Sequence, residues 1–269
     1  MDTAHLPFFI QFGKFRVYLA SRAEHIEGAQ KLRYDVFYKE MGANESASLA
    51  RGRDEDSFDA FVEHLVVQDK DKNKIVGTYR LLRREGARKH GSFYTQGEFD
   101  VTSLLAMPGE ILEVSRSCVD RAYRTQSVMG LLWRGLAEYI LHYDVQYLFG
   151  CGSFHGTDPS QVAHGLSYLY HHHLLPESYR TRTLPQYFKP LVHMPKEAVD
   201  TKKALADIPP LLRGYTRIGG GVGDGIFIDE EFNTIDVCVV VDSNCLKPKF
   251  AQHFNAHSEQ TSRFPLNAS

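Results

Sequence analysis

The sequence predicts a mixed α/β protein built around one sheet, and three observations support this fold class. Runs rich in β-forming residues alternate along the chain with helical patterns instead of being segregated from them. An amphipathic helix is predicted over 128–143, and a short buried strand over 147–150 follows it directly. A chain of 269 residues, 43% of them hydrophobic, is long enough for one substantial core or for one domain with a large appendage.

Composition limits the partners of the chain. Its net charge of -2 generates no overall field that attracts nucleic acid or an anionic membrane. The four cysteines, Cys118, Cys151, Cys238 and Cys245, form no C-x-x-C pair, which argues against a zinc site and a disulfide framework and favours a reducing cytoplasm. We see no signal peptide and no apolar run near the ~20 residues that span a bilayer, so any membrane contact is expected to be peripheral.

The first elements are a strand and a helix. Residues 16–19 are typical of a short strand, and Ser21 with Glu24 predicts a capping box at the start of a helix. The segment 44–59 is polar without periodicity, which predicts a mobile loop. Apolar residues recur at helical spacing up to Gly42, and these are Ile26, Ala29, Leu32 or Arg33, Val36, Phe37 and Met41.

The middle of the chain predicts a hairpin, a third strand and the clearest helix. Two β-rich runs, 64–68 and 75–82, are separated by a polar turn. The strand over 110–119 alternates imperfectly, which predicts a bulge. The apolar stripe of the following helix is formed by Val128, Leu132, Leu136, Ile140 and Tyr143.

Asp158 and Pro159 predict the N-cap and first turn of another helix, which extends through His173. The three consecutive histidines at its end point to different faces, so they cannot share one metal ion, and we predict no metal site. The glycine-rich segment 219–225 does not join a strand to a helix as a nucleotide-binding loop does, and we interpret it as a flexible flap near the substrate site. A last strand is predicted over 234–241.

The junction over 119–128 joins a strand to the clearest helix, where N–H groups and the helix dipole favour an anion. A basic turn without a ligand explains the same residues equally well. This junction resembles the Tyr-Arg-Gly-x-Gly-x-Gly loop of GNAT acyltransferases, which grips the pyrophosphate of coenzyme A, but Thr125 and Ser127 replace two glycines. The resemblance therefore implies a site for the single phosphate of phosphopantetheine, formed by Arg121, Tyr123, Arg124, Thr125 and Ser127.

A second resemblance connects the N-terminal half to acyl-homoserine-lactone synthases, which take acyl groups from acyl carrier protein. It rests on the order of the motifs Asp-Ser-Phe-Asp, Gly-Thr-Tyr-Arg-Leu-Leu and Glu-Val-Ser-Arg after the first helix. The residues that carry it are Arg33, Phe37, Asp56, Asp59, Arg80, Glu113 and Arg116.

The chain most fully resembles the ornithine N-α-acyltransferases, which make lyso-ornithine lipid. The motifs are Gly77-Thr78-Tyr79-Arg80-Leu81-Leu82, Glu113-Val114-Ser115-Arg116-Ser117-Cys118-Val119, Leu131-Leu132-Trp133-Arg134-Gly135-Leu136, Phe154-His155-Gly156-Thr157-Asp158-Pro159, Leu211-Leu212-Arg213-Gly214-Tyr215 and Phe232-Asn233-Thr234-Ile235-Asp236-Val237. The resemblance implies transfer of a 3-hydroxyacyl group from the phosphopantetheine thioester of acyl carrier protein to the α-amine of ornithine, with no bound cofactor. Relatives that acylate glycine or other amino acids share much of the pattern, so the acceptor stays open.

The same resemblance implies the domain organisation. A GNAT-like core, a mixed sheet flanked by helices, is expected over 16–175, preceded by an N-terminal arm over 1–15. A C-terminal extension over 176–253 is expected to complete the pocket and add a strand. The tail, 254–269, is predicted to be disordered.

The reaction requires an amine to lose a proton and attack a thioester carbonyl, so a base must lie near the amine. Glu113, in the middle of a strand, is the first candidate, and a structural ion pair with Arg116 or Arg80 is the alternative. His155 is the second candidate, although a hydrogen-bonded loop histidine would look the same.

The charged groups of the acceptor are expected to meet Arg33, Asp56, Asp59, Arg80 and Arg116, whereas a solvated acidic loop is the alternative for Asp54 and Glu55. Acidic carrier protein is expected to dock on basic clusters, although ordinary surface charge explains each of them singly. The clusters are Arg83 with Arg84, Arg88 with Lys89, and Arg180, Arg182 and Lys189.

Taken together, these patterns predict a cytoplasmic acyltransferase with peripheral contact at the inner face of the cytoplasmic membrane and no nucleic-acid partner. Two alternatives stay open. One is an acyl-homoserine-lactone synthase, and the other is a domain that binds acyl chains without turnover.

Overall fold

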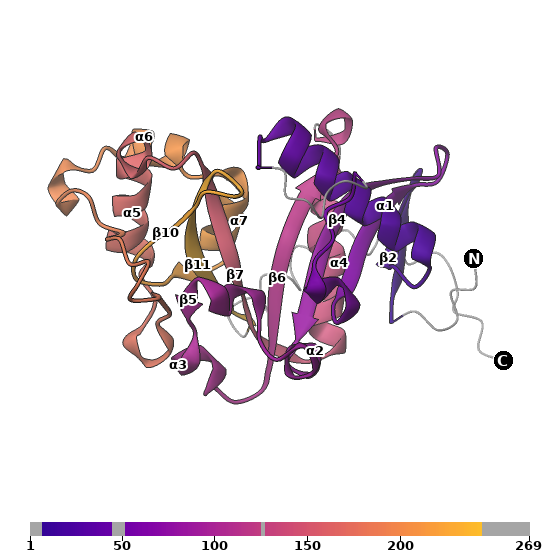
Figure 1. The fold of residues 1–269 in the computed structure, drawn as a ribbon, viewed down its shortest axis with the longest axis horizontal. Helices are drawn as coiled ribbons and strands as arrows, with labels where there is room; N and C mark the ends of the chain where they lie inside the picture. Colours follow the sequence, from indigo (N-terminus) through magenta and orange to yellow (C-terminus); the bar gives the residue numbers. More distant parts are fainter. Residues whose placement is uncertain (1–6, 45–51, 125–126, 244–269) are drawn as a thin grey trace.

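The computed structural model describes residues 7–44, 52–124 and 127–243. Its centre is a nine-stranded sheet in the order β1-β2-β3-β4-β6-β7-β11-β10, with β9 paired to β11, and β5 and β8 form a separate small sheet. In Figure 1 the N-terminal and C-terminal parts lie on opposite sides of the β6–β7 junction. The strands are β1 (Phe9–Phe12), β2 (Phe15–Leu19), β3 (Glu63–Asp69), β4 (Lys74–Arg83), β5 (Phe99–Asp100), β6 (Glu110–Val119), β7 (Val145–His155), β8 (Arg182–Thr183), β9 (Gly221–Val222), β10 (Phe227–Asp229) and β11 (Thr234–Asp242).

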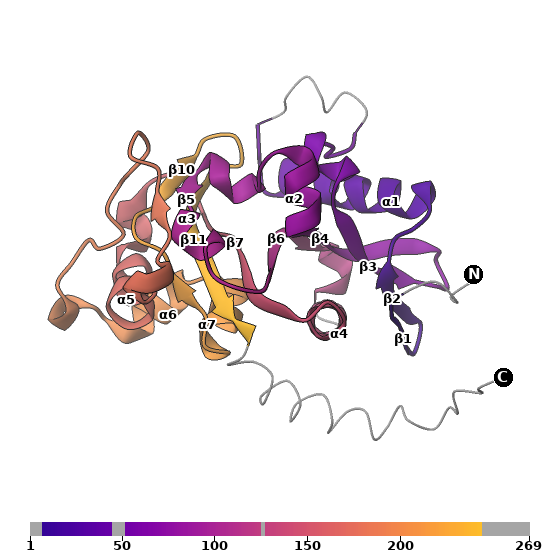
Figure 2. The ribbon, with the colours of Figure 1, turned by 90° about the horizontal axis from the view of Figure 1, so that it is seen from below.

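Helices cover both faces of the sheet. Helix α1 packs on β3, β4 and β6, whereas α4 packs on β2, β3, β4 and β7. Figure 2 shows these two helices on opposite faces. The C-terminal helix α7 contacts β7 and β11. The helices are α1 (Ala23–Tyr34), α2 (Arg84–His90), α3 (Thr102–Leu105), α4 (Val128–His142), α5 (Ala163–His173), α6 (Thr201–Asp207) and α7 (Pro210–Arg217).

Strand β3 carries buried apolar side chains on both faces of the sheet. Successive side chains of a strand point to opposite faces. Leu65 and Val67 accordingly belong to the core cluster that contains the buried face of α4, and Val66 belongs to the cluster under α1. Because both faces are covered by helices, the strand reads as a continuous apolar run instead of an alternating one.

Strands β6 and β7 part in the middle of the sheet. They pair in parallel only from Glu110 to Glu113 of β6. Beyond this point β6 continues against β4, whereas β7 continues against β11 as far as His155. Gly150 lies where the two strands separate, and a Cβ atom there would stand 2.2 Å from the carbonyl oxygen of Val114. Glycine at this position therefore allows the last close approach of the two strands before they diverge.

Most of the predicted elements are confirmed. The predicted hairpin is β3–β4, the clearest helix is α4, and the last strand is β11. The predicted bulge is present, because the β4–β6 register shifts between Thr78 and Arg80 and Arg116 has φ +53°. Asp158 caps a 3-10 turn, Pro159–Val162, that leads into α5, because its carboxylate accepts a hydrogen bond from the Ser160 N–H.

Three predictions of local structure are wrong. The capping box is absent, because α1 starts at Ala23 without a side-chain cap and Glu24 instead lies 2.5 Å from Arg22. The glycine-rich segment is not a flexible flap, since β9 within it pairs with β11. The polar segment after Asn44 is not simply a mobile loop, because Asp54 is buried.

Some predictions lie outside the described residues. These are the mobility of 45–51, the position of Thr125, Cys245 and the disorder of the tail. Residues 9–12 of the predicted N-terminal arm form the edge strand β1. The predicted domain boundaries stay predictions. No helix in the described part of the chain is long and apolar enough to cross a membrane.

We predict that Gly150→Ala destabilises the protein by about 1–3 kcal/mol, because the added methyl group would push β7 against the backbone of β6. The matched control is Gly130→Ala in α4, where a Cβ atom meets nothing within 4 Å. That change is expected to stabilise by up to about 1 kcal/mol through helix propensity. Denaturant unfolding measures both, and equal stability of the two variants would contradict the close approach.

Candidate active site

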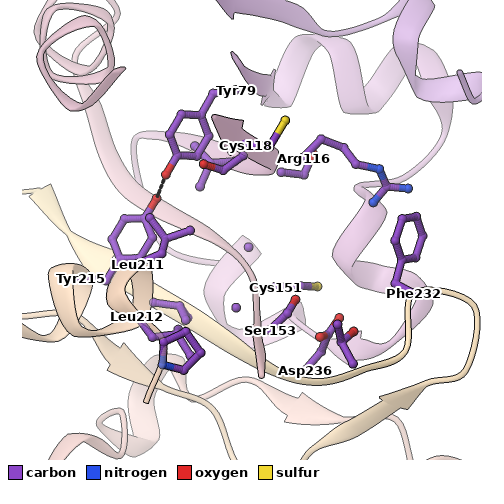
Figure 3. Close-up of a pocket in the computed structure, with 18 of the residues that line it drawn as sticks. Tyr79, Arg116, Cys118, Cys151, Ser153, Leu211, Leu212, Tyr215, Phe232 and Asp236 are labelled. Carbon is purple, nitrogen blue, oxygen red and sulfur yellow. Dashed lines mark hydrogen bonds between the residues drawn. The ribbon is translucent and has the colours of Figure 1, made fainter. Parts of the chain in front are cut away.

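A cavity of about 620 Å³ lies where β6 and β7 part. It is lined by residues of β6, β7, β11, α7, the start of α4 and the π-helical turn Asp35–Glu40 that follows α1. On one side, apolar residues surround Tyr79 and Tyr215, whose hydroxyl oxygens lie 3.1 Å apart. On the opposite side, Figure 3 shows Arg116 and Asp236 at its wall. The cavity thus joins an apolar surface to a charged one.

Arg116 reaches the cavity from the bulge in β6. Its positive φ angle turns the residue out of the regular strand pattern. The guanidinium carbon lies 4.8 Å from the ring centre of Tyr94 and 4.4 Å from that of Phe232. Its Nε atom is 3.3 Å from a carboxylate oxygen of Asp54. Two aromatic rings and a carboxylate therefore fix this cation at the wall of the cavity.

Arg116 belongs to a cluster of three arginines and three aspartates. Arg33 is 0% exposed and its Nε atom donates to Asp54 at 2.9 Å. The Nη1 atom of Arg80 donates to both carboxylate oxygens of Asp56 at 2.7 Å. The cluster balances its charges, and Arg116 is its one member that lines the cavity in the described part of the chain. Its members are Arg33, Arg80, Arg116, Asp54, Asp56 and Asp59.

This ionic cluster holds together five residues that the sequence assigned to acceptor binding, and it also buries Asp54. His64 lies against it, with Nε2 3.5 Å from Asp59. Burial, and then the charge of Arg33, lowers the pKa of His64 to about 4, so this ring is neutral at pH 7. Direct contact of Arg33, Asp56, Asp59 or Arg80 with a substrate stays a prediction.

The first candidate base, Glu113, does not line the cavity. It is 1% exposed, and its carboxylate accepts hydrogen bonds from the backbone N–H groups of Tyr94 at 3.0 Å and Thr95 at 2.7 Å. Burial raises the pKa of Glu113, although the hydrogen bonds from Thr95 and Tyr94 oppose this shift. Glu113 therefore holds the turn that presents Tyr94 to the cavity.

The second candidate base, His155, is exposed at the end of β7 and is not among the cavity-lining residues. It lies opposite Thr234 in the register of β7 and β11. The structure thus brings neither Glu113 nor His155 to the cavity wall. Their catalytic roles stay predictions.

The residues of the predicted phosphopantetheine site lie in different environments. Arg124 lines the cavity near α4, but its guanidinium also donates to Glu40, with Nη2 and Oε2 2.9 Å apart. Tyr123 is buried and its hydroxyl donates to Asp69 at 3.0 Å, so it faces the core. Arg121 and Ser127 are exposed beside it, and Thr125 lies outside the described residues. Phosphate binding here stays a prediction.

A buried acidic cluster was missed by the sequence analysis. It comprises Glu98, Cys151 and Asp236, whose oxygen and sulfur atoms lie within 4.8 Å of one another. The Cys151 thiol donates to Glu98 at 3.1 Å. Burial, and then the charge of Asp236, raises the pKa of Glu98 to about 8, and burial raises the pKa of Asp236 to about 6. The signal in the sequence was an aspartate between apolar residues of a buried strand.

Several residues of the predicted basic clusters have partners within the chain. Arg180 and Arg182 both contact Glu177, at 2.5 and 2.6 Å. Arg84 donates to the backbone carbonyl groups of Leu105 and Met107. Docking of carrier protein on these residues stays a prediction.

A mixed sheet whose two central parallel strands part over a cavity, with α1 and α4 on its two faces, defines a GNAT-fold acyltransferase. Residues 32–134 match the family model described as "Acetyltransferase (GNAT) domain". Among solved structures, a CoA-dependent acyl-homoserine lactone synthase aligns with a TM-score of 0.49 and 14% identity, over 86% of this chain and 82% of that chain.

Curated relatives identify the family. The chain is 39% identical to the L-ornithine N(alpha)-acyltransferase of Brucella abortus, over 93% of this chain and 92% of the relative. It is 38% identical to that of Rhodobacter capsulatus, over 91% and 96% of the two chains. It is 40% identical to that of Rhizobium meliloti, over 88% of this chain and 83% of the relative. The chain therefore belongs to the L-ornithine N(alpha)-acyltransferase family, as its motifs indicated, and is an acyltransferase.

We predict that Arg33→Met lowers the free energy of unfolding by about 3–5 kcal/mol, because it removes the nearest cation of two buried carboxylates and leaves the cluster with an excess negative charge. Arg53→Met removes a more exposed ion pair with Glu27 and is expected to cost at most about 1 kcal/mol. Denaturant unfolding compares the variants. Similar losses would show that the buried cluster does not order the segment that carries Asp54.

Proposed function

We propose that the enzyme transfers a 3-hydroxyacyl group from the thioester of acyl carrier protein to the α-amine of L-ornithine, forming lyso-ornithine lipid. The observation that carries this proposal is 37–40% identity to four L-ornithine N(alpha)-acyltransferases along about nine-tenths of the chain. The cavity supports it, because its surface suits a substrate pair that is part apolar and part charged.

The apolar side of the cavity suits the acyl chain. Leu211 and Leu212 of α7 and Val239 of β11 line it. Burying an acyl chain against such side chains contributes roughly 0.8 kcal/mol for each methylene group. At the opposite side, the Arg116 guanidinium matches the α-carboxylate of an amino acid by charge and by its planar donors.

The parting of β6 and β7 suits the thioester. Backbone groups of diverging strands are not all used in pairing, so they can hold the pantetheine arm beside the cavity. The amine attacks the thioester carbonyl, a C–N bond forms and the C–S bond breaks, and the thiol leaves with a proton. Glu113 and His155 remain our candidates for accepting the amine proton, and both would act through a water molecule because neither lines the cavity.

We also propose peripheral contact with the cytoplasmic membrane, because the product is an amphiphile with one acyl chain. Phe9 and Phe12 on the edge strand β1 are exposed and support such contact. Burying exposed phenylalanine rings at the boundary between lipid headgroups and acyl chains is favoured by the hydrophobic effect.

We predict that expression in a host without aminolipids yields lyso-ornithine lipid, detected by mass spectrometry of the lipid extract. Arg116→Met is expected to reduce its amount about 100-fold or more, because the acceptor carboxylate loses its charged partner. Accumulation of an acylated glycine or of an acyl-homoserine lactone, with no ornithine product, would contradict the proposed acceptor.

The donor is tested with purified enzyme. We expect activity with acyl carrier protein to fall as salt is raised, because the Debye length shortens from ~10 Å at 0.1 M to ~3 Å at 1 M. Arg124→Ala should raise the KM for this donor more than it lowers kcat, since the phosphate contact is present before and during the reaction. Glu40→Ala should lower that KM, because it frees Arg124 and removes a negative charge. Equal efficiency and equal salt dependence with acyl-CoA would overturn the carrier-protein proposal.

A further inference from the structure

The acidic cluster of Glu98, Cys151 and Asp236 lies at the wall of the acceptor end of the cavity. Asp236 lines the cavity from β11, and Cys151 lines it from β7. Figure 3 shows Asp236 pointing into the open space beside Ser153, with Cys151 next to it. Glu98 stands behind them and accepts the hydrogen bond of the Cys151 thiol.

Asp236 has unused hydrogen-bonding capacity. It is 4% exposed, and the hydroxyl groups of Ser153 and Thr234 stabilise its charged form, but its Oδ1 atom has no hydrogen-bond partner among the described residues. An unsatisfied buried acceptor costs about 1–3 kcal/mol, and more when it is charged. A buried aspartate that turns toward a substrate cavity and has one oxygen atom without a partner points to a donor that arrives with the substrate.

The charges at this end favour a cation. The nearby arginines Arg33, Arg80 and Arg116 are matched by the three aspartates of the ionic cluster. Asp229 adds a further carboxyl group at the cavity wall, where it accepts hydrogen bonds from the N–H groups of Glu231 and Phe232. The charge of Arg116 favours the ionised forms of Glu98 and Asp236, but Arg116 is shared with the ionic cluster, and no residue in the described part of the chain makes an ion pair with the acidic cluster.

We infer that Asp236, supported by Glu98 and Cys151, binds the side-chain ammonium of the acceptor and makes the enzyme select a diamino acid. This inference rests on the proposed function, since it concerns the acceptor of the same cavity. An ammonium group has three N–H donors and no acceptor, and it matches a site of grouped oxygen and sulfur atoms. The bound ammonium would also allow Glu98 and Asp236 to be ionised together, because two neighbouring carboxylates repel each other when no cation lies between them.

The arrangement assigns each polar group of the acceptor to a different place. The carboxylate meets Arg116, and the side-chain ammonium meets Asp236, so the uncharged α-amine is left to face the acyl group. An amino acid with an apolar side chain would bury Asp236 without a partner. A site that leaves a buried polar group unpaired discriminates strongly against the wrong substrate.

The test is Asp236→Asn, which keeps the shape of the side chain and removes its charge. Initial rates are measured with 3-hydroxyacyl carrier protein and two acceptors, ornithine and norvaline, which has the same carbon chain without the side-chain amine. We expect kcat/KM for ornithine to fall about 100-fold, while that for norvaline changes less than about threefold. Glu98→Gln should act in the same direction with a smaller effect.

The control is Asp100→Asn, which removes an exposed carboxylate on β5 that accepts a hydrogen bond from the Thr102 N–H. It should leave both acceptors unchanged. An equal loss with ornithine and norvaline in Asp236→Asn would overturn the inference, since Asp236 would then be a general base or a structural residue. Loss of wild-type activity on treatment with a chelator, restored by zinc, would also overturn it, because the cluster would then hold a metal.

Calorimetric titration of ornithine and norvaline into the free enzyme separates this inference from the proposed function. Tighter binding of ornithine than of norvaline, abolished by Asp236→Asn with an unchanged Tm, supports the inference even if no donor is used. Equal binding of the two amino acids by the wild-type protein overturns it while acyl transfer stands. If ornithine binds selectively but is never acylated, the proposed function fails and the ammonium site remains.

Discussion

The parting of β6 and β7 is the constraint on which the rest of the structure depends. Parallel strands in a packed sheet normally stay about 4.8 Å apart and leave no room for a ligand. Here the last close approach, between Val114 and Gly150, is followed by loss of the pairing between the two strands, while β6 keeps β4 as its neighbour and β7 keeps β11. β6 remains with the N-terminal strands and β7 joins the C-terminal ones, so the cavity opens inside a sheet that is continuous elsewhere.

The bulge in β6 and the ionic cluster depend on each other. A residue other than glycine with positive φ costs roughly 1–3 kcal/mol and persists only where its surroundings hold it. Arg116 is held by Asp54 and by two aromatic rings. Asp54 in turn is held by Arg33 from α1. The segment that carries Asp54 is therefore ordered by pairing with buried arginines. The same network positions the guanidinium of Arg116 at the cavity wall.

Local patterns predicted much of the fold and only part of the site. The apolar stripe of α4 and the β-rich runs and polar turn of the β3–β4 hairpin are properties of neighbouring residues, so they could be found in the sequence. The burial of Asp54 could not be found in this way, because it depends on Arg33, which is 21 residues away. The glycine-rich segment that contains β9 resembled a loop for the same reason, since the pairing of β9 with β11 is not visible locally.

The proposed functional groups came from the family motifs, and the sequence analysis missed Asp236 although it lies within one such motif. It stands in a strand whose neighbours Ile235 and Val237 are buried, and the pairing of that strand with β7 is what brings it beside Cys151. The two charged contributions to the acceptor end thus come from opposite sides of the parting. Arg116 arrives with the N-terminal ionic cluster and Asp236 with the C-terminal strand. Because neither part alone contains both groups, binding of the proposed diamino acid requires the whole sheet to assemble. The cavity that accepts the acyl chain then also fixes the distance between the two charged side chains that bind the acceptor.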